Sequence, residues 1–254
     1  MKNDIKAVAF DLDGTLYPNY RLNIRLVPFA LKNSRFLLGF QKARKILHSL
    51  TPADLAKASP PSDSSPPTPH SPLPTSYFYD KQAALLGKLL GVQPHIIKEK
   101  IEKQIYRGWE PHFQKIKLYP GVIETLEAFR SAGLKLGLLS DFPPETKLKN
   151  LGIDSYWDAV LCSERCGVLK PDALPFKKIA NALGLVPRQI LFVGNSLRYD
   201  VGGAKAAGMS AALIYRYPFK MGLSSLQKRV GGNADRLPNF IFKDYRQLCN
   251  FVLY

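Results

Sequence analysis

Cysteine is scarce in this chain of 254 residues, which contains only Cys162, Cys166 and Cys249. Three scattered cysteines are too few for a disulfide framework, so the sequence excludes the class of small disulfide-stabilised secreted domains. No histidine lies near Cys162 and Cys166 to complete a zinc site. We therefore expect two free thiols there, one at the end of a strand and one in the loop that follows.

Long apolar runs are also missing. No stretch approaches the length that crosses a bilayer. The first residues, Met-Lys-Asn-Asp-Ile-Lys, lack the apolar centre of a signal peptide. We therefore expect a cytoplasmic location. An apolar content of 46% is ample for a core, and the length suits one moderately large domain or a core with a smaller insert.

Acidic residues are absent between Asp13 and Asp54, although the same segment contains Arg21, Arg25, Lys32, Arg35, Lys42, Arg44 and Lys45. The whole chain has a formal net charge of +16. The simplest interpretation of the basic segment 21–45 is a solvated helical face. The alternative is a surface that attracts anionic substrates or acidic lipid headgroups. We expect no stable nucleic-acid or membrane partner.

The first half of the chain reads as one strand followed by helices. Residues 6–10 form a short apolar run, and apolar residues then recur at roughly helical spacing through 18–114. A Pro/Ser-rich tract at 59–76 interrupts that spacing and predicts an extended or disordered loop. Residues 18–114 are therefore interpreted as a helical insert.

After residue 121 strands and helices alternate. The sequence predicts strands at 134–139, 158–162, 190–193 and 211–215, and helices at 122–132, 176–183 and 201–207. Ile241 and Phe242, followed by a helix through residue 251, close the chain. This alternation is typical of an α/β fold with a doubly wound, mostly parallel sheet that has helices on both faces. The first strand rejoins the sheet, so the insert projects from its carboxyl edge as a lid.

Polar side chains follow four of these strands: Asp11 and Asp13, then Ser140, then Lys170, and finally Asn195, Ser196 and Asp200. The carboxyl ends of the strands lie side by side in such a sheet. One carboxylate can attack phosphorus while another handles protons. Oxygen ligands can hold a hard cation, and a serine and a lysine can bind phosphate oxygens. The set suits phosphoryl transfer.

Four motifs in order carry a resemblance to a known family: Asp-Leu-Asp-Gly-Thr at 11–15, Leu-Leu-Ser-Asp at 138–141, Lys-Pro-Asp at 170–172, and the segment 194–209 that begins Gly-Asn-Ser. The chain resembles the haloacid dehalogenase superfamily of hydrolases, in the form with a helical cap inserted after the first strand. The resemblance implies a Rossmann-like core formed by residues 1–17 and 115–254, with residues 18–114 as the cap.

The resemblance also implies roles. Asp11 is the expected nucleophile that forms an aspartyl-phosphate, and Asp13 the general acid and then the base. Thr15, Ser140 and Lys170 are expected to hold the phosphate. Mg²⁺ is expected at the Asp11 carboxylate, the Asp13 backbone carbonyl and the fourth motif, from Asn195 with Asp200 as a further candidate. Family members that act on carbon–halogen or phosphonate bonds usually lack an acid at the position of Asp13, so a phosphatase acting on a small phosphorylated metabolite is favoured.

One position departs from the family pattern. Asn195 stands where the fourth motif usually has aspartate, so the site loses one negative charge while keeping a neutral oxygen for a cation. An active phosphatase is our leading hypothesis. The alternatives are a phosphomutase of the same fold and a non-catalytic regulator that binds phosphate or metal. The sequence predicts no oligomeric state.

The four histidines, His48, His70, His95 and His112, all fall in the insert or its linkers. None is therefore expected in a catalytic triad of the core. Each is expected at the surface.

Overall fold

A computed structural model describes residues 4–51, 75–216 and 237–254. Most of the predicted Pro/Ser loop, residues 59–74, lies outside the described residues. Thr75 and Ser76, its last two members, instead begin helix α5 (Thr75–Leu90). None of the helices in the described ranges has the length and apolar content that crossing a membrane requires.

The centre of the molecule is a six-stranded sheet in which every neighbouring pair of strands is parallel. The strand order is β3-β2-β1-β4-β5-β6. The strands are β1 (Ala7–Phe10), β2 (Lys135–Ser140), β3 (Ala159–Cys162), β4 (Ile190–Gly194), β5 (Ser210–Ile214) and β6 (Phe240–Phe242). The order reverses around β1, and ligands of doubly wound sheets bind at such a reversal, outside the carboxyl ends of the strands. The predicted α/β fold is confirmed.

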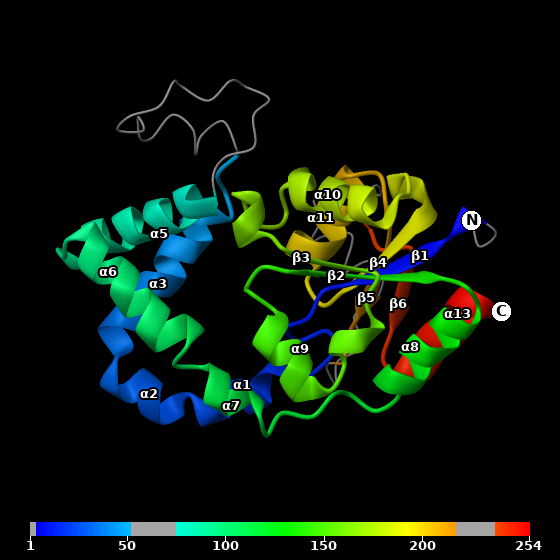
Figure 1. Ribbon diagram of the computed structural model, residues 1–254, viewed down its shortest axis with the longest axis horizontal. Coiled ribbons are helices and arrows are strands. Elements are labelled where there is room, and N and C mark those ends of the chain that lie inside the picture. Colours follow the sequence, from blue (N-terminus) through cyan, green and yellow to red (C-terminus); the bar gives the residue numbers. More distant parts are fainter. Residues whose placement is uncertain (1–3, 52–74, 217–236) are drawn as a thin grey trace.

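Helices cover both faces of this sheet (Figure 1). Alternate residues of β1 enter different apolar clusters, since Val8 and Phe10 belong to one and Ala7 and Ala9 to the other. Residues of α8, α9 and α13 join the first cluster, and residues of α10 and α11 join the second. These helices are α8 (Val122–Ser131), α9 (Glu145–Leu151), α10 (Ala173–Leu183), α11 (Gly202–Ala206) and α13 (Tyr245–Leu253).

The remaining helices form a second lobe beside the carboxyl edge of the sheet (Figure 1). They are α1 (Asn19–Arg25), α2 (Val27–Lys32), α3 (Ser34–Leu47), α5, α6 (Pro94–Ile101), the π-helix η2 (Glu102–Tyr106) and α7 (Glu110–Phe113). Buried residues of α3, α5, α6 and η2 share an apolar cluster of their own. Leu22, Leu26 and Phe113 instead pack into the first cluster of the sheet. The exact domain limits at 17/18 and 114/115 stay a prediction.

Three local features differ from the sequence prediction. Helix α10 begins three residues early because the Asp172 side chain accepts a hydrogen bond from the Leu174 N–H (2.8 Å) and caps it. The predicted helix 201–207 is split between the π-helix η6 (Leu197–Val201) and α11. Helix α9 was not predicted, since it is short and follows Pro143 and Pro144. Short 3₁₀ turns occur at η3 (Asp154–Tyr156), η4 (Glu164–Cys166) and η5 (Pro187–Gln189).

The basic segment 21–45 is not uniformly solvated. Arg44 of α3 is buried, and its guanidinium donates to the carboxylate of Glu164, a fully buried residue of η4. The Tyr106 hydroxyl donates to the other oxygen of Glu164 (3.1 Å). The prediction of a solvated face is therefore wrong for Arg44, because this residue links the helical lobe to the sheet.

Candidate active site

The carboxyl end of β1 places Asp11 in the middle of the sheet. The Asp11 N–H donates to the Val193 carbonyl of β4 (2.9 Å), and the Asp11 side chain is almost fully buried. Lys170 Nζ donates to Asp11 Oδ1 (2.6 Å) and also to Asp200 Oδ1 (2.7 Å). The predicted meeting of Asp11, Lys170 and Asp200 is thus observed, and one lysine lies between two carboxylates.

Asp200 also holds the loop after β4. Its Oδ2 accepts hydrogen bonds from the N–H groups of Asn195 (3.1 Å) and Ser196 (2.9 Å). A Cβ at Gly194 would collide with the Asp200 side chain, so glycine is required for this close approach. Both Asp200 oxygens are therefore engaged, and in the structure this residue positions Lys170 and the loop.

Burial and charge shift the pKa values of this trio. Burial raises the pKa of Asp11 to about 7, against the opposing effect of the Lys170 ammonium. Burial on its own lowers the pKa of Lys170, but Asp11 and Asp200 outweigh it and raise that pKa above its usual range. Lys170 is therefore a fixed positive charge next to Asp11.

Asp13 lies at the mouth of the site with a partner that the sequence did not suggest. Lys147 Nζ of α9 is 2.7 Å from both carboxylate oxygens of Asp13, and the Tyr17 hydroxyl donates to the same carboxylate. Burial on its own raises the pKa of Asp13, but the Lys147 ammonium and the hydrogen bonds outweigh it, so the pKa is lowered. Lys147 was missed because α9 was missed, and no motif marks it.

Two predicted phosphate-binding residues lie deep in the site. Thr15 and Ser140 are fully buried. The Thr15 hydroxyl donates to Asp11 Oδ2 (2.7 Å), and the Ser140 hydroxyl oxygen accepts from the Phe142 N–H (3.2 Å). In this structure Thr15 orients the Asp11 carboxylate, while Ser140 supports the loop after β2.

The predicted metal ligands supply oxygen atoms close together. Asn195 Nδ2 donates to the Asp13 backbone carbonyl (3.2 Å), so rotation of the amide would bring its oxygen to the same place. A side chain at Gly14, whose φ is +86°, would collide with that amide. Carboxylate, carbonyl and amide oxygens suit a hard cation such as Mg²⁺. No cluster of three or more His, Cys, Asp or Glu side chains suited to a metal occurs within the described ranges, so a cation here needs the carbonyl and amide oxygens.

His48 corrects the surface prediction. Its side chain is only 13% exposed, stacks on the Tyr199 ring (centroids 4.4 Å apart) and places Nδ1 2.5 Å from the Lys170 carbonyl oxygen. Asp141 Oδ1 accepts from the Lys170 N–H (3.2 Å). The end of α3 thus supports the backbone that carries Lys170. Of the other histidines, His95 is exposed, His112 is partly exposed, and His70 lies outside the described residues.

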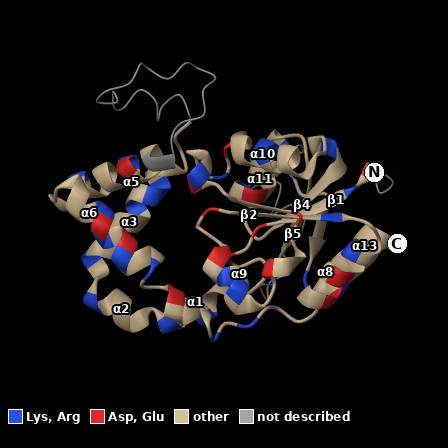
Figure 2. Cartoon of the chain, viewed as in Figure 1, with Lys and Arg blue, Asp and Glu red and all other residues tan. Residues whose placement is uncertain are grey.

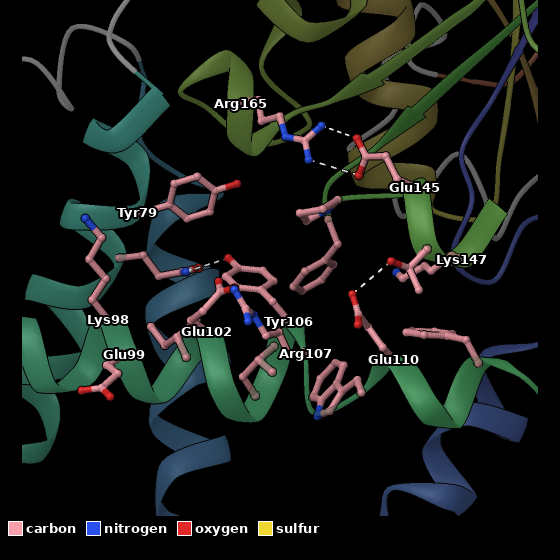
Figure 3. Close-up of a pocket in the computed structure, with 18 of the residues that line it drawn as sticks. Tyr79, Lys98, Glu99, Glu102, Tyr106, Arg107, Glu110, Glu145, Lys147 and Arg165 are labelled. Atoms are coloured by element: carbon pink, nitrogen blue, oxygen red, sulfur yellow. Dashed lines mark hydrogen bonds and ion pairs between the residues drawn. The ribbon is translucent and has the colours of Figure 1, made fainter. Parts of the chain in front are cut away.

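Two neighbouring cavities open over these residues. The smaller, about 260 Å³, is lined by Asp11, Asp13, Lys147, Lys170 and Asn195, among others. The larger, about 960 Å³, lies between the helical lobe and the loops after β2 and β3 (Figure 3). Trp109, Phe142 and Lys147 line both. The larger cavity is edged by charged groups of both signs: Lys98, Arg107 and Arg165 with Glu99, Glu102, Glu110 and Glu145.

Comparisons with known proteins agree with this geometry. The family model for haloacid dehalogenase-like hydrolases matches residues 5–208. A glyceraldehyde 3-phosphate phosphatase of Methanopyrus kandleri is 28% identical over 98% of this chain and 97% of its own length. A phosphoglycolate phosphatase of Salmonella typhi is 30% identical over 85% of this chain and 84% of its own.

A solved structure shares the fold as well. The crystal structure of a HAD phosphatase from Thermococcus onnurineus superimposes with a TM-score of 0.60, at 24% identity over 98% of both chains. The matched family region contains Asp11, Asp13, Lys170 and Asp200, which the structure gathers at one sheet edge. The chain therefore belongs to the haloacid dehalogenase-like hydrolases.

Proposed function

We propose that this protein is a Mg²⁺-dependent phosphatase that hydrolyses a small phosphomonoester through an aspartyl-phosphate on Asp11. The observation that carries the proposal is the contact between Asp11 and Lys170, with Asp13 at the mouth of the same cavity. Relatives named as phosphatases that align over most of both chains support the same activity.

The proposed reaction has two steps. An Asp11 carboxylate oxygen attacks phosphorus, the bond from phosphorus to the leaving oxygen breaks, and Asp13 gives that oxygen a proton. Water then attacks the aspartyl-phosphate, Asp13 takes a proton from the water, and phosphate and free Asp11 are released. Lys170 holds negative charge on the phosphoryl group throughout.

Lys147 suits the second of the two roles of Asp13. Its charge keeps the Asp13 carboxylate ionised in the free protein, which is the form that accepts a proton from water. A bound phosphate adds negative charge beside Asp13 and favours uptake of a proton, the form that the first step needs.

The residues present fit a bound Mg²⁺. The Asp11 carboxylate, the Asp13 carbonyl and the Asn195 amide oxygen would hold it, with Asp200 close behind them. When bound, the cation neutralises part of the charge on the phosphate and so lets the anionic Asp11 approach. A group of four carboxylates (Asp11, Asp13, Asp141 and Asp200) and only two lysines (Lys147 and Lys170) lines the smaller cavity, which leaves excess negative charge for a cation.

The larger cavity is the proposed binding place for the rest of the substrate. It adjoins the smaller one through shared walls, and aromatic rings of Tyr106, Trp109 and Phe142 line it beside charged groups (Figure 3). A small metabolite with both apolar and charged parts fits this lining.

The test is turnover of a generic aryl phosphate with Mg²⁺ by the purified chain. Wild type is expected to release phosphate, and Asp11→Asn is expected to lose activity by about a thousandfold or more, because the amide cannot form the acyl-phosphate. Circular dichroism and a thermal melt check that the variant is folded. Near-normal rates in folded Asp11→Asn would refute the nucleophile assignment.

Product analysis with a sugar phosphate separates hydrolysis from phosphoryl return to the substrate. Inorganic phosphate as the product supports the phosphatase. An isomeric sugar phosphate without release of inorganic phosphate would make the enzyme a phosphomutase.

A further inference from the structure

Helices α1 and α2 turn large apolar side chains toward solvent. Ile24 is 65% exposed and Leu31 is 77% exposed, while Tyr20 and Val27 are exposed to a lesser degree. These positions recur at the i, i+4, i+7, i+11 spacing of one helical face. The backbone between the two helices, at Leu26, also has right-handed helical angles. Large exposed apolar side chains in a row are uncommon on a solvated surface and indicate contact with something else.

The opposite side of the same segment packs against the core and lines the smaller cavity. Leu22 and Leu26 are buried in the first cluster of the sheet. Asn19, Leu22 and Asn23 line the smaller cavity. The exposed stripe therefore faces away from the catalytic residues, and its apolar side chains are not needed for the core.

Positive charge borders the stripe. Arg21, Arg25, Lys32 and Arg35 are all exposed, and no acidic residue occurs in residues 14–53. Figure 2 shows basic residues on α2 at the outer edge of the molecule. Two more exposed lysines, Lys115 and Lys117, flank Ile116, which shares the cluster of Leu22 and Leu26.

The acidic residue of the neighbouring helix α7 does not offset this charge. Glu110 accepts a hydrogen bond from the Thr146 hydroxyl (3.0 Å) and lines the larger cavity (Figure 3). Its carboxylate is thus directed to the interior side of the lobe.

We propose that this docking face, formed by Tyr20, Ile24, Val27 and Leu31 with Arg21, Arg25, Lys32 and Arg35, binds peripherally to an anionic lipid bilayer. An interfacial helix presents apolar side chains bordered by cations to lipid. The apolar side chains enter the headgroup region, and the cations contact the anionic headgroups. From the basic residues alone we expected a solvated face and no stable membrane partner. The exposure of the four apolar side chains favours lipid contact instead.

Other occupants fit less well. A second copy of this chain would bring two cationic faces together without an acidic partner within either docking face. Nucleic acid would use the cations but leave the aliphatic side chains in water, since its backbone contacts are made by charged and polar groups. The lipid surface alone satisfies both parts of the face.

The experiment is co-sedimentation of the full-length chain with vesicles of phosphatidylcholine, with and without about one third phosphatidylglycerol. Wild type is expected to bind the vesicles that contain phosphatidylglycerol, and this binding should weaken as the salt concentration rises. It is not expected to bind vesicles of phosphatidylcholine alone. The double variant Leu31→Ser/Lys32→Gln is expected to bind at least about tenfold more weakly. Its hydrolysis of a soluble phosphomonoester is expected to be unchanged, because neither residue lines a described cavity.

A matched control variant replaces one exposed apolar and one exposed basic side chain on another part of the surface. Val186, directly before the η5 turn, is an exposed apolar residue, and Arg188, within that turn, is an exposed basic residue. The Val186→Ser/Arg188→Gln variant is expected to bind anionic vesicles as wild type does. Equal losses in both variants would overturn the assignment of the face, since they would report net charge alone.

Three other results would overturn the proposal. One is no sedimentation of wild type with anionic vesicles near physiological salt. A second is that wild type binds duplex RNA but not the vesicles, and that Leu31→Ser/Lys32→Gln weakens the RNA binding. The third is a dimer in analytical ultracentrifugation that the same variant dissociates, which would assign the face to a second copy. None of these readouts depends on catalysis, so the inference and the proposed function can fail separately.

Discussion

At the scale of single residues, a shared lysine organises the site. Lys170 joins the nucleophile candidate Asp11 to Asp200, and Asp200 in turn fixes the loop that carries Asn195. The sequence predicted this meeting because parallel strands end at one edge of a sheet. It did not predict Lys147 or His48, whose roles depend on helices α9 and α3 reaching that edge.

Asn195 offers the sharpest residue-scale prediction. Asn195→Asp restores a charged oxygen beside the Asp13 carbonyl, so Mg²⁺ is expected to bind about tenfold more tightly by isothermal titration calorimetry, because a carboxylate is a stronger ligand than an amide. The concentration of Mg²⁺ that half-activates aryl phosphate hydrolysis should fall in parallel.

The same variant separates enzyme from regulator. Wild type without turnover, together with an active Asn195→Asp, would favour the non-catalytic regulator. Unchanged Mg²⁺ affinity in the variant would remove Asn195 from the proposed ligand set. Asn239→Asp, at an amide that binds the Ala211 N–H rather than the cavity, serves as the control.

At the scale of elements, the two lobes meet through a buried ion pair. Arg44 of α3 reaches Glu164 of η4, and the Arg44 guanidinium lies 4.1 Å from the centre of the Phe142 ring, in the loop after β2. Leu47 and Phe78 pack nearby against Val168 and Leu169, directly before Lys170. The same group of contacts therefore positions both the helical lobe and the loop that carries Lys170.

Breaking this pair should be costly. Glu164→Gln is expected to lower the free energy of unfolding by about 3 kcal/mol, since it leaves the buried Arg44 charge without its anionic partner. Chemical denaturation measures the loss. The control is Glu145→Gln, which breaks the half-exposed pair with Arg165 and should cost less than about 1 kcal/mol. Similar losses in both variants would show that burial does not set the strength of the Arg44 pair.

At the scale of the whole molecule, the last helix supports the first motif. The Tyr245 hydroxyl of α13 donates to the Thr15 backbone carbonyl (2.7 Å), and Tyr245 is almost fully buried. The chain therefore returns to the segment that carries Asp11 and Asp13 after building the entire sheet.

Tyr245→Phe tests this support. The substitution removes a buried donor to the Thr15 carbonyl, so it is expected to lower the free energy of unfolding by about 1–2 kcal/mol and to reduce kcat more than it raises KM. Tyr156→Phe is the control, because its hydroxyl donates to Glu127 at the exposed surface (3.1 Å) and should change neither quantity. An unaltered kcat in Tyr245→Phe would confine the contact to stability.

The sequence by itself determined the parallel α/β sheet and the meeting of Asp11, Asp13, Lys170, Asn195 and Asp200. Hydrophobic periodicity and the succession of strands and helices along the chain can be read from the sequence. Because parallel strands end at one edge of the sheet, the polar residues that follow them form a site. Only the tertiary structure decided the partners of these residues. The sequence placed Arg44 among the surface cations, and no sequence motif marked Lys147. Both were missed because burial and ion pairing arise between segments that are far apart in the chain. The same limit hid the outward stripe on α1 and α2, whose apolar spacing could equally have faced the core.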